Sequence, residues 1–175
     1  MQRLVLASML ASFSGVIKIM FQATTLSDFR FSLYEIPLII AGLVLGPALG
    51  AISGFASDWI YATTFGYGFN LMTLSATLWG FIPGLILYRK KFTMKRTMIA
   101  IVVATIFSFG VNSIQLGLWS GWLAMLGNMP IRLGIILISL PVQGYLIYQI
   151  YHRVVVPSGY LELTELSHPK VSKEH

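Results

Sequence analysis

Long uncharged runs dominate the pattern of hydrophobic and polar positions along this chain. No Asp, Glu, Lys or Arg occurs in residues 36–57, 70–88, 97–131 and 133–151. An apolar run of about 18 residues or more is typical of a transmembrane helix. Only 10% of the residues are charged and the mean hydropathy is +0.77, whereas about a quarter of the residues of a soluble domain are charged. The pattern predicts an integral, all-α membrane protein.

The number of membrane crossings depends on the stretch 33–62. If it forms one helix the chain has five spans, and if it breaks at Gly46-Pro47 the chain has six. A proline inside a helix removes a hydrogen bond and collides with the preceding turn, so we predict the break. Each half is short for a hydrocarbon core of ~30 Å, so we expect tilt, or a second span that starts nearer Phe29. The other spans are expected at about 4–20, at 70–88, from Thr97 onward, and up to Arg153.

The segment RKKFTMKR at residues 89–96 indicates the orientation in the membrane. It carries five basic groups in eight positions, and cytoplasmic loops are enriched in Lys and Arg. With six spans, this loop and both termini lie in the cytoplasm. A nucleic-acid patch is less favoured for so short a loop between two spans, so no nucleic-acid partner is expected. Residues 1–154 are predicted to form a six-helix transmembrane domain, and 155–175 a polar cytoplasmic tail.

The first apolar stretch is not followed by a small-residue cleavage site and runs on into the next hydrophobic region. A cleavable secretory signal peptide ends at such a site. We therefore expect this stretch to remain in the protein as the first membrane span.

A glycine stands at every fourth position of GLVLGPALGAISGFASD, residues 42–58, which ends on Asp58. Beyond the break, Gly50, Gly54 and Asp58 share a face, because residues four apart are neighbours on a helix. Small residues let helix backbones approach closely in lipid, so helix packing accounts for the glycines. An ionisable residue inside a span is costly and usually faces the bundle interior at a functional site. Asp58 is therefore predicted to point inward and to bind ligand.

Most polar side chains of the predicted spans fall at one depth, on the outer side. The sixth span is expected to begin at Pro130, and two loops on the same side, 22–32 and 63–70, are placed to close a pocket. Aromatic faces beside a few convergent polar groups suit a planar heteroaromatic ligand. The distribution predicts a pocket open to the outside. Lys18 and Glu35 lie at this depth, and the ligand-binding candidates are Arg30, Asp58, Phe69, Asn112, Gln115, Trp119 and Arg132.

Other interpretations of these polar residues stay open. Lys18 is also placed to extend its ammonium group to the membrane interface. Arg132 and Asp58 are also candidates to pair with each other, and Asn112 and Gln115 to form hydrogen bonds between helices. The aromatic residues of the outer loops also fit a belt at the membrane interface.

The first span carries Ala7, Ala11 and Gly15 on one side. A small-xxx-small pattern is common where membrane helices pack inside a bundle. Because this one lies near the predicted cytoplasmic end, it is also a candidate docking surface for another membrane protein.

A membrane enzyme is disfavoured. The histidines are His152, His168 and His175, at or beyond the predicted cytoplasmic end, so none is available inside the membrane as a base or a metal ligand. Neither HExxH nor GxSxG occurs, and without cysteine there is no thiol nucleophile or disulfide. No metal or cofactor is expected. A structural membrane subunit and a stand-alone secondary carrier remain alternatives.

These residues resemble the substrate-binding S subunits of energy-coupling factor (ECF) vitamin transporters. Ala7 and Ala11 match the Ala-xxx-Ala motif of the family's first helix. The stretches FRFSLYEIPLIIAGLVLGPALGAISGFASD and TLSATLWGFIPGLIL, with NSIQLGLWSGW and PIRLGIILISLPVQ further on, are similar to the folate group. One departure is GFNLMTLSA, where that group is expected to carry PGFTLSA. The resemblance covers about residues 4–153.

The resemblance implies a six-helix protein of the bacterial plasma membrane that captures a vitamin at the outer face. The S subunit would then dock through its Ala-xxx-Ala face on a transmembrane coupling subunit that carries two ATPase subunits, and ATP hydrolysis there would drive release inside. No GxxxxGK[ST] motif occurs in this chain, so it has no P-loop of its own.

The resemblance also implies roles for the candidate residues if the ligand is folate. Asp58 or Asn112 would pair with the amino and ring N–H edge of the pterin, and Phe69 or Trp119 would stack on the ring. The glutamyl carboxylates would meet an arginine, either Arg30 or Arg132, because a guanidinium binds a carboxylate through two hydrogen bonds. Riboflavin, pantothenate or a pyrimidine precursor remains an alternative ligand within the family.

Overall fold

The computed structural model describes residues 2–23, 33–66, 68–90 and 92–157. The described chain is all-helical and contains no strand, which confirms the predicted fold class. In these ranges six α-helices follow one another, and the last continues as a π-helical turn at Tyr151–Val155. They are α1 (Gln2–Ala23), α2 (Glu35–Leu45), α3 (Pro47–Phe65), α4 (Leu71–Leu87), α5 (Met94–Ser120) and α6 (Trp122–Ile150).

Within the described part of the chain, three helical segments are long and apolar enough to cross a membrane, namely Gln2–Met20, Met94–Ser120 and Trp122–Val155. The helices α2 and α4 are apolar but shorter. Large apolar side chains are exposed along the outside of the bundle, among them Met9, Leu123 and Leu137, which are 64%, 87% and 70% exposed. Apolar surface of this extent is costly in water and is expected where lipid covers the protein. The structure therefore has the character of a membrane protein.

The predicted break at Gly46-Pro47 is confirmed. Gly46 has φ +96° and ψ 173°, a backbone conformation that a residue with a Cβ rarely adopts. Its N–H donates to the carbonyl of Gly42 and ends α2, and Pro47 is the first residue of α3. Proline suits that position because its missing N–H would have no partner in the first turn. The helix α2 begins at Glu35 and has 11 residues, which makes it about 16 Å long at 1.5 Å per residue.

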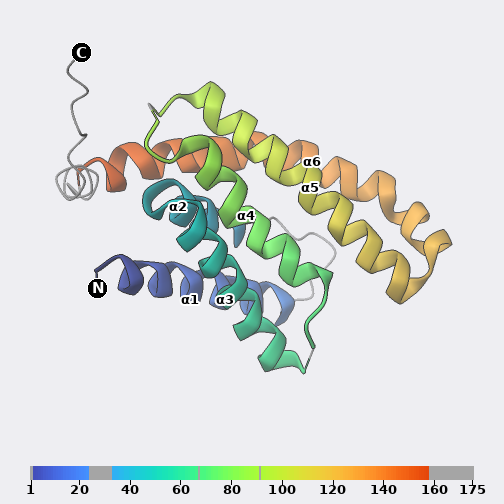
Figure 1. Cartoon of the computed structure of the whole chain (residues 1–175). Helices are drawn as coiled ribbons and strands as arrows, with labels where there is room; N and C mark the ends of the chain where they lie inside the picture. The colour runs from blue at the N-terminus through green and yellow to red at the C-terminus, as the bar shows by residue number, and fades with distance from the viewer. Residues whose placement is uncertain (1, 24–32, 67, 91, 158–175) are drawn as a thin grey trace, which may run out of the picture.

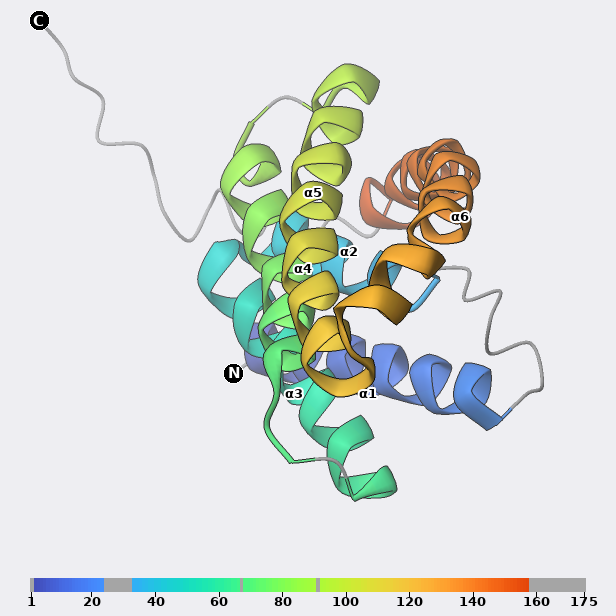
Figure 2. The same cartoon turned by 90° about the vertical axis from the view of Figure 1, so that its right-hand side faces the viewer.

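The glycine series brings the backbones of α2, α3 and α4 into direct contact. A Cβ built on Gly80 of α4 would lie 1.9 Å from the carbonyl oxygen of Gly50, and one on Gly42 would lie 2.2 Å from that of Gly80. A Cβ on Gly54 would lie 2.2 Å from the carbonyl oxygen of Ala76. Because α4 also packs against α5, it lies at the centre of the bundle, as Figure 1 and Figure 2 both show. The glycines are therefore required by close helix packing, as the spacing predicts.

The sixth helix begins earlier than the sequence indicates. It starts at Trp122, directly after Gly121, and Pro130 lies inside it. The prediction that this span begins at Pro130 is therefore wrong: a turn at Gly121, with φ +86°, already reverses the chain. Arg132 lies about 15 Å from the helix start at 1.5 Å per residue, and so well along the helix rather than near its end.

The small-residue face of α1 packs against the rest of this chain. Ala7 and Ala11 are 5% and 2% exposed. The carbonyl of Ala7 accepts a hydrogen bond of 3.2 Å from Ser53 of α3, and a Cβ on Gly15 would lie 3.3 Å from the carbonyl oxygen of Ser57. A partner subunit would reach this face only after α1 had moved away from α3. The docking role of Ala7, Ala11 and Gly15 stays a prediction.

Candidate functional site

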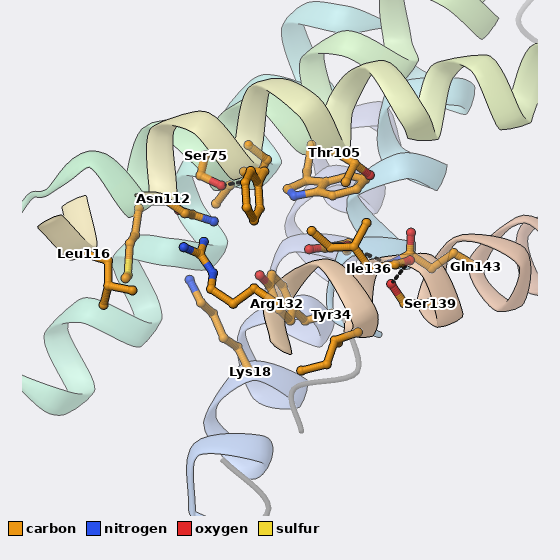
Figure 3. A pocket seen from close by; sticks show the side chains of 17 residues that line it. Lys18, Tyr34, Ser75, Thr105, Asn112, Leu116, Arg132, Ile136, Ser139 and Gln143 are labelled. Carbon is orange, nitrogen blue, oxygen red and sulfur yellow. Dashed lines mark hydrogen bonds between the residues drawn. The ribbon is translucent and has the colours of Figure 1, made fainter. Parts of the chain in front are cut away.

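A cavity of about 270 Å³ opens between five of the helices. Its volume lies just below the ~300–1,000 Å³ that is usual for small-molecule pockets. Four of the polar residues that the sequence places at one depth line it together, namely Lys18, Glu35, Asn112 and Arg132 (Figure 3). The remaining lining residues are Tyr34, Met72, Ser75, Ala76, Trp79, Thr105, Ser108, Phe109, Leu116, Ile135, Ile136, Ser139 and Gln143.

One side of the cavity carries two cations, Lys18 of α1 and Arg132 of α6, with Asn112 beside them (Figure 3). Nη1 of Arg132 donates a hydrogen bond of 3.1 Å to Oγ of Ser113, and its guanidinium lies 4.7 Å from the centre of the Phe109 ring. Within the described residues, Arg132 makes no ion pair with a carboxylate. A guanidinium held in place by neutral partners at a cavity wall is suited to bind an anionic group.

Asp58 of α3 balances the positive charge of Lys18. The two side chains form an ion pair in which the lysine is 13% and the aspartate 3% exposed. The other carboxylate oxygen of Asp58 accepts a hydrogen bond of 2.6 Å from Thr73. The ammonium group also lies 4.6 Å from the centre of the Tyr61 ring. These contacts hold Lys18 inside the bundle.

The ion pair with Lys18 decides two of the open alternatives. Lys18 faces the bundle interior, so the interpretation that it extends to the membrane interface is wrong. Asp58 pairs with Lys18 and not with Arg132, so the alternative pairing is wrong as well. Asp58 points inward, as predicted, but it contacts Lys18. It is not among the described residues that line the cavity.

The opposite side of the cavity is lined by an acid and an amide. Nε2 of Gln143 in α6 donates a hydrogen bond of 2.7 Å to Oε2 of Glu35 at the start of α2, and both side chains are buried, at 3% and 5% exposure. Figure 3 shows Ser139, Gln143 and Thr105 on this side, away from Lys18 and Arg132. The cavity is therefore polarised, with cations at one end and a carboxylate at the other.

Three of the predicted ligand-binding residues lie elsewhere in the structure. Gln115 is buried, and its Oε1 accepts a hydrogen bond of 2.9 Å from the backbone N–H of Leu71 at the start of α4. Trp119 is 53% exposed near the end of α5. Phe69 is 62% exposed, and its ring centre lies 4.5 Å from that of Trp59. None of the three is among the described residues that line the cavity, and Arg30 lies outside the described residues.

Sequence reasoning alone does not identify several of the cavity residues. The clearest are Trp79, Ser75 and Ser108, all within uncharged runs. The two serines form a hydrogen bond with each other across the α4–α5 contact. Gln143 is also missed, because a single neutral amide within the uncharged run 133–151 is a weak signal.

The described part of the chain is a bundle of apolar helices around a polarised cavity, an arrangement typical of a membrane protein that binds a small molecule. A family model described as "ECF transporter, substrate-specific component" matches residues 2–157. The chain therefore belongs to the substrate-specific components of ECF transporters, as the resemblance indicates.

Two further comparisons concern individual proteins. The chain is 34% identical over 89 residues to a folate transporter, FolT, of Clostridium novyi (strain NT), a match that covers 49% of this chain and 52% of that protein. It thus spans about half the length of this curated relative. A solved structure described as "Crystal structure of FolT bound with folic acid" has a TM-score of 0.67 and 23% sequence identity, and the match covers 83% of this chain and 91% of that one. This likeness shows the fold.

Proposed function

We propose that this chain is the folate-binding S component of an ECF importer. The observation that carries the proposal is the polarised cavity, in which Arg132 lies without a carboxylate partner among the described residues while Glu35 lines the other side. Folate has the same polarity, because a donor-rich pterin ring is at one end and glutamyl carboxylates are at the other. The similarity to FolT proteins supports the same ligand.

The contacts suggest an orientation for folate in the cavity. Arg132 would bind the glutamyl carboxylates, because hydrogen bonds between charged groups are the stronger ones, and Lys18, which is paired with Asp58, would lie beside them. Glu35, held by Gln143, would accept from the amino group and ring N–H of the pterin. Asn112 remains a proposed ligand contact, and in this orientation it lies nearer the cationic end (Figure 3). The predicted roles of Arg30, Asp58, Phe69, Gln115 and Trp119 remain proposals that ligand titrations of variants can test.

Calorimetric titration of the purified protein tests the ligand. We expect folic acid to bind, and riboflavin and pantothenate not to bind at the same concentrations, because neither carries both a pterin-like edge and two carboxylates. Tight binding of riboflavin or pantothenate with no binding of folic acid would overturn the folate assignment and favour another vitamin.

Arg132→Gln is expected to weaken folic acid binding about 10-fold to 100-fold, because a hydrogen bond to a charged group contributes about 1.5–3 kcal/mol. Pteroic acid, which lacks the glutamate, is expected to lose much less affinity. The matched control is Arg153→Gln, since Arg153 is exposed on the turn after α6 and lies away from the cavity. Equal losses for folic acid and pteroic acid would remove Arg132 from the carboxylate site.

Transport itself is proposed to need an ATP-driven module. We propose that the chain captures folate at the outer face of the bacterial plasma membrane, with both termini and residues 89–96 in the cytoplasm, and docks on a transmembrane coupling subunit with two ATPases. Uptake of labelled folic acid by cells that express this chain is expected only when the coupling module is also present. Uptake by the chain alone would favour the alternative of a stand-alone secondary carrier.

A further inference from the structure

Trp79 on α4 and Asn112 on α5 each bring a buried polar atom to the cavity wall that has no hydrogen-bond partner among the described residues. The atoms are Nε1 of Trp79 and Oδ1 of Asn112. Trp79 is only 3% exposed. A buried donor that stays unsatisfied costs about 1–3 kcal/mol, and most buried polar groups in proteins do have a partner. These two atoms therefore indicate positions at which a ligand completes the hydrogen bonding.

The position of Trp79 is set by the backbone packing of α4. The next residue, Gly80, packs closely against the backbone of α3, since a Cβ built on it would lie 1.9 Å from the carbonyl oxygen of Gly50. The neighbouring hydroxyls on the same wall are engaged with each other or with the backbone: Ser75 bonds Ser108, and Thr105 donates to the carbonyl of Ile101 at 2.8 Å. Trp79 thus lines the cavity from a closely packed helix, which suits a residue that discriminates between ligands.

We propose that Trp79 donates its indole N–H to an acceptor atom on the ring system of the ligand and thereby helps to select it. The inference rests on the proposed function, which supplies a pterin as that ring. The edge of a pterin carries ring nitrogens and a carbonyl oxygen that accept hydrogen bonds. Recognition by an N–H group is selective, because an analogue without the acceptor leaves the donor unpaired.

Trp79→Phe removes the N–H and keeps a flat apolar ring in the cavity wall. We expect it to weaken folic acid binding about 10-fold, because the ligand acceptor then loses its buried hydrogen bond. The test compares folic acid with analogues that each lack one acceptor of the pterin: carbon in place of N1, N5 or N8, or an amino group in place of O4. The matched control is Trp122→Phe, because Trp122 is 56% exposed and does not line the cavity. The affinity of this control variant for folic acid should stay within about twofold of that of the natural protein.

One analogue is expected to bind the natural protein more weakly than folic acid does, and to bind Trp79→Phe as tightly as it binds the natural protein. The acceptor that this analogue lacks is then the atom that bonds the indole N–H. An equal loss for folic acid and every analogue, or no loss for folic acid, would overturn the inference. If the natural protein fails to bind folic acid at all, the proposed function fails instead, so the two failures are distinguishable.

A second measurement needs no substitution at Trp79. The chain has four tryptophans, and isotope labelling of their indole nitrogens resolves them by NMR once the variants of Trp59, Trp119 and Trp122 have assigned the other signals. Folic acid is expected to slow hydrogen exchange of the Trp79 indole N–H and to move its resonance. An unchanged exchange rate and position at saturating folic acid would overturn the inference even if Trp79→Phe does not fold.

Discussion

Gly80→Ala is expected to prevent the bundle from packing as it does in the natural protein. The added methyl group would lie 1.9 Å from the carbonyl oxygen of Gly50 and 3.1 Å from the backbone nitrogen of Ala51. Backbone atoms cannot rotate away as a flexible side chain can, so α3 and α4 must separate along their whole contact. Overpacking of this kind costs about 3 kcal/mol or more, which corresponds to a fall in melting temperature of about 6 °C or more for a chain of this size.

The matched control is Gly110→Ala on α5. Nothing lies within 4 Å of a Cβ built on Gly110, and alanine is the better helix former, so the melting temperature should be unchanged or slightly higher. Thermal unfolding of both variants in the same detergent makes the comparison. If Gly80→Ala and Gly110→Ala melt at the same temperature, the close contact between the backbones of α3 and α4 is incorrect.

Asp58→Asn is expected to destabilise the protein by about 3–5 kcal/mol, because it leaves the ammonium group of Lys18 without its counter-charge inside the bundle. The carboxylate also accepts a hydrogen bond from Thr73, and an amide in the same place retains only part of that bonding. The melting temperature should fall by about 6 °C or more. Thermal unfolding measures the effect. Because asparagine and aspartate are nearly equal in size, the substitution leaves no cavity that could account for the loss of stability.

A double-mutant cycle separates the ion pair from other effects of the substitution. Lys18→Met removes the charge that Asp58 compensates, so the double variant Lys18→Met with Asp58→Asn should be more stable than Asp58→Asn alone. Strictly additive losses in the two single variants would show that the two charges do not stabilise each other, and would contradict the pairing between α1 and α3.

The sequence is sufficient for the features that depend on neighbours along the chain. The uncharged runs predict the helices, and the Gly46-Pro47 pair predicts the break, because both follow from local backbone chemistry. The four-residue glycine spacing predicts a close-packed face with Asp58 turned inward, because helical periodicity alone decides which residues share a face. The family resemblance, confirmed over residues 2–157, rests on the same local stretches.

The partners of the polar side chains are less accessible to sequence reasoning. It assigns Asp58 and Gln115 to the pocket, yet the structure pairs Asp58 with Lys18 and Gln115 with the first turn of α4. A polar residue in an apolar helix shows that some partner exists, but not whether that partner is a ligand or another helix. The start of α6 is misplaced for a related reason, since Pro130 is tolerated inside the helix and the turn is made at Gly121.

A helical membrane bundle of the ECF substrate-specific components, with a break at Pro47 and an inward-facing acid, follows from the amino-acid sequence without any coordinates. Which side chains meet does not follow from the sequence. The crossing of the helices places Arg132 in a cavity opposite Glu35 and Gln143, which are 108 positions apart in the chain, and brings Trp79 into the wall of the same cavity. Hydrophobic period and backbone propensity act over a few residues, whereas a binding cavity is formed between helices that are distant in the sequence.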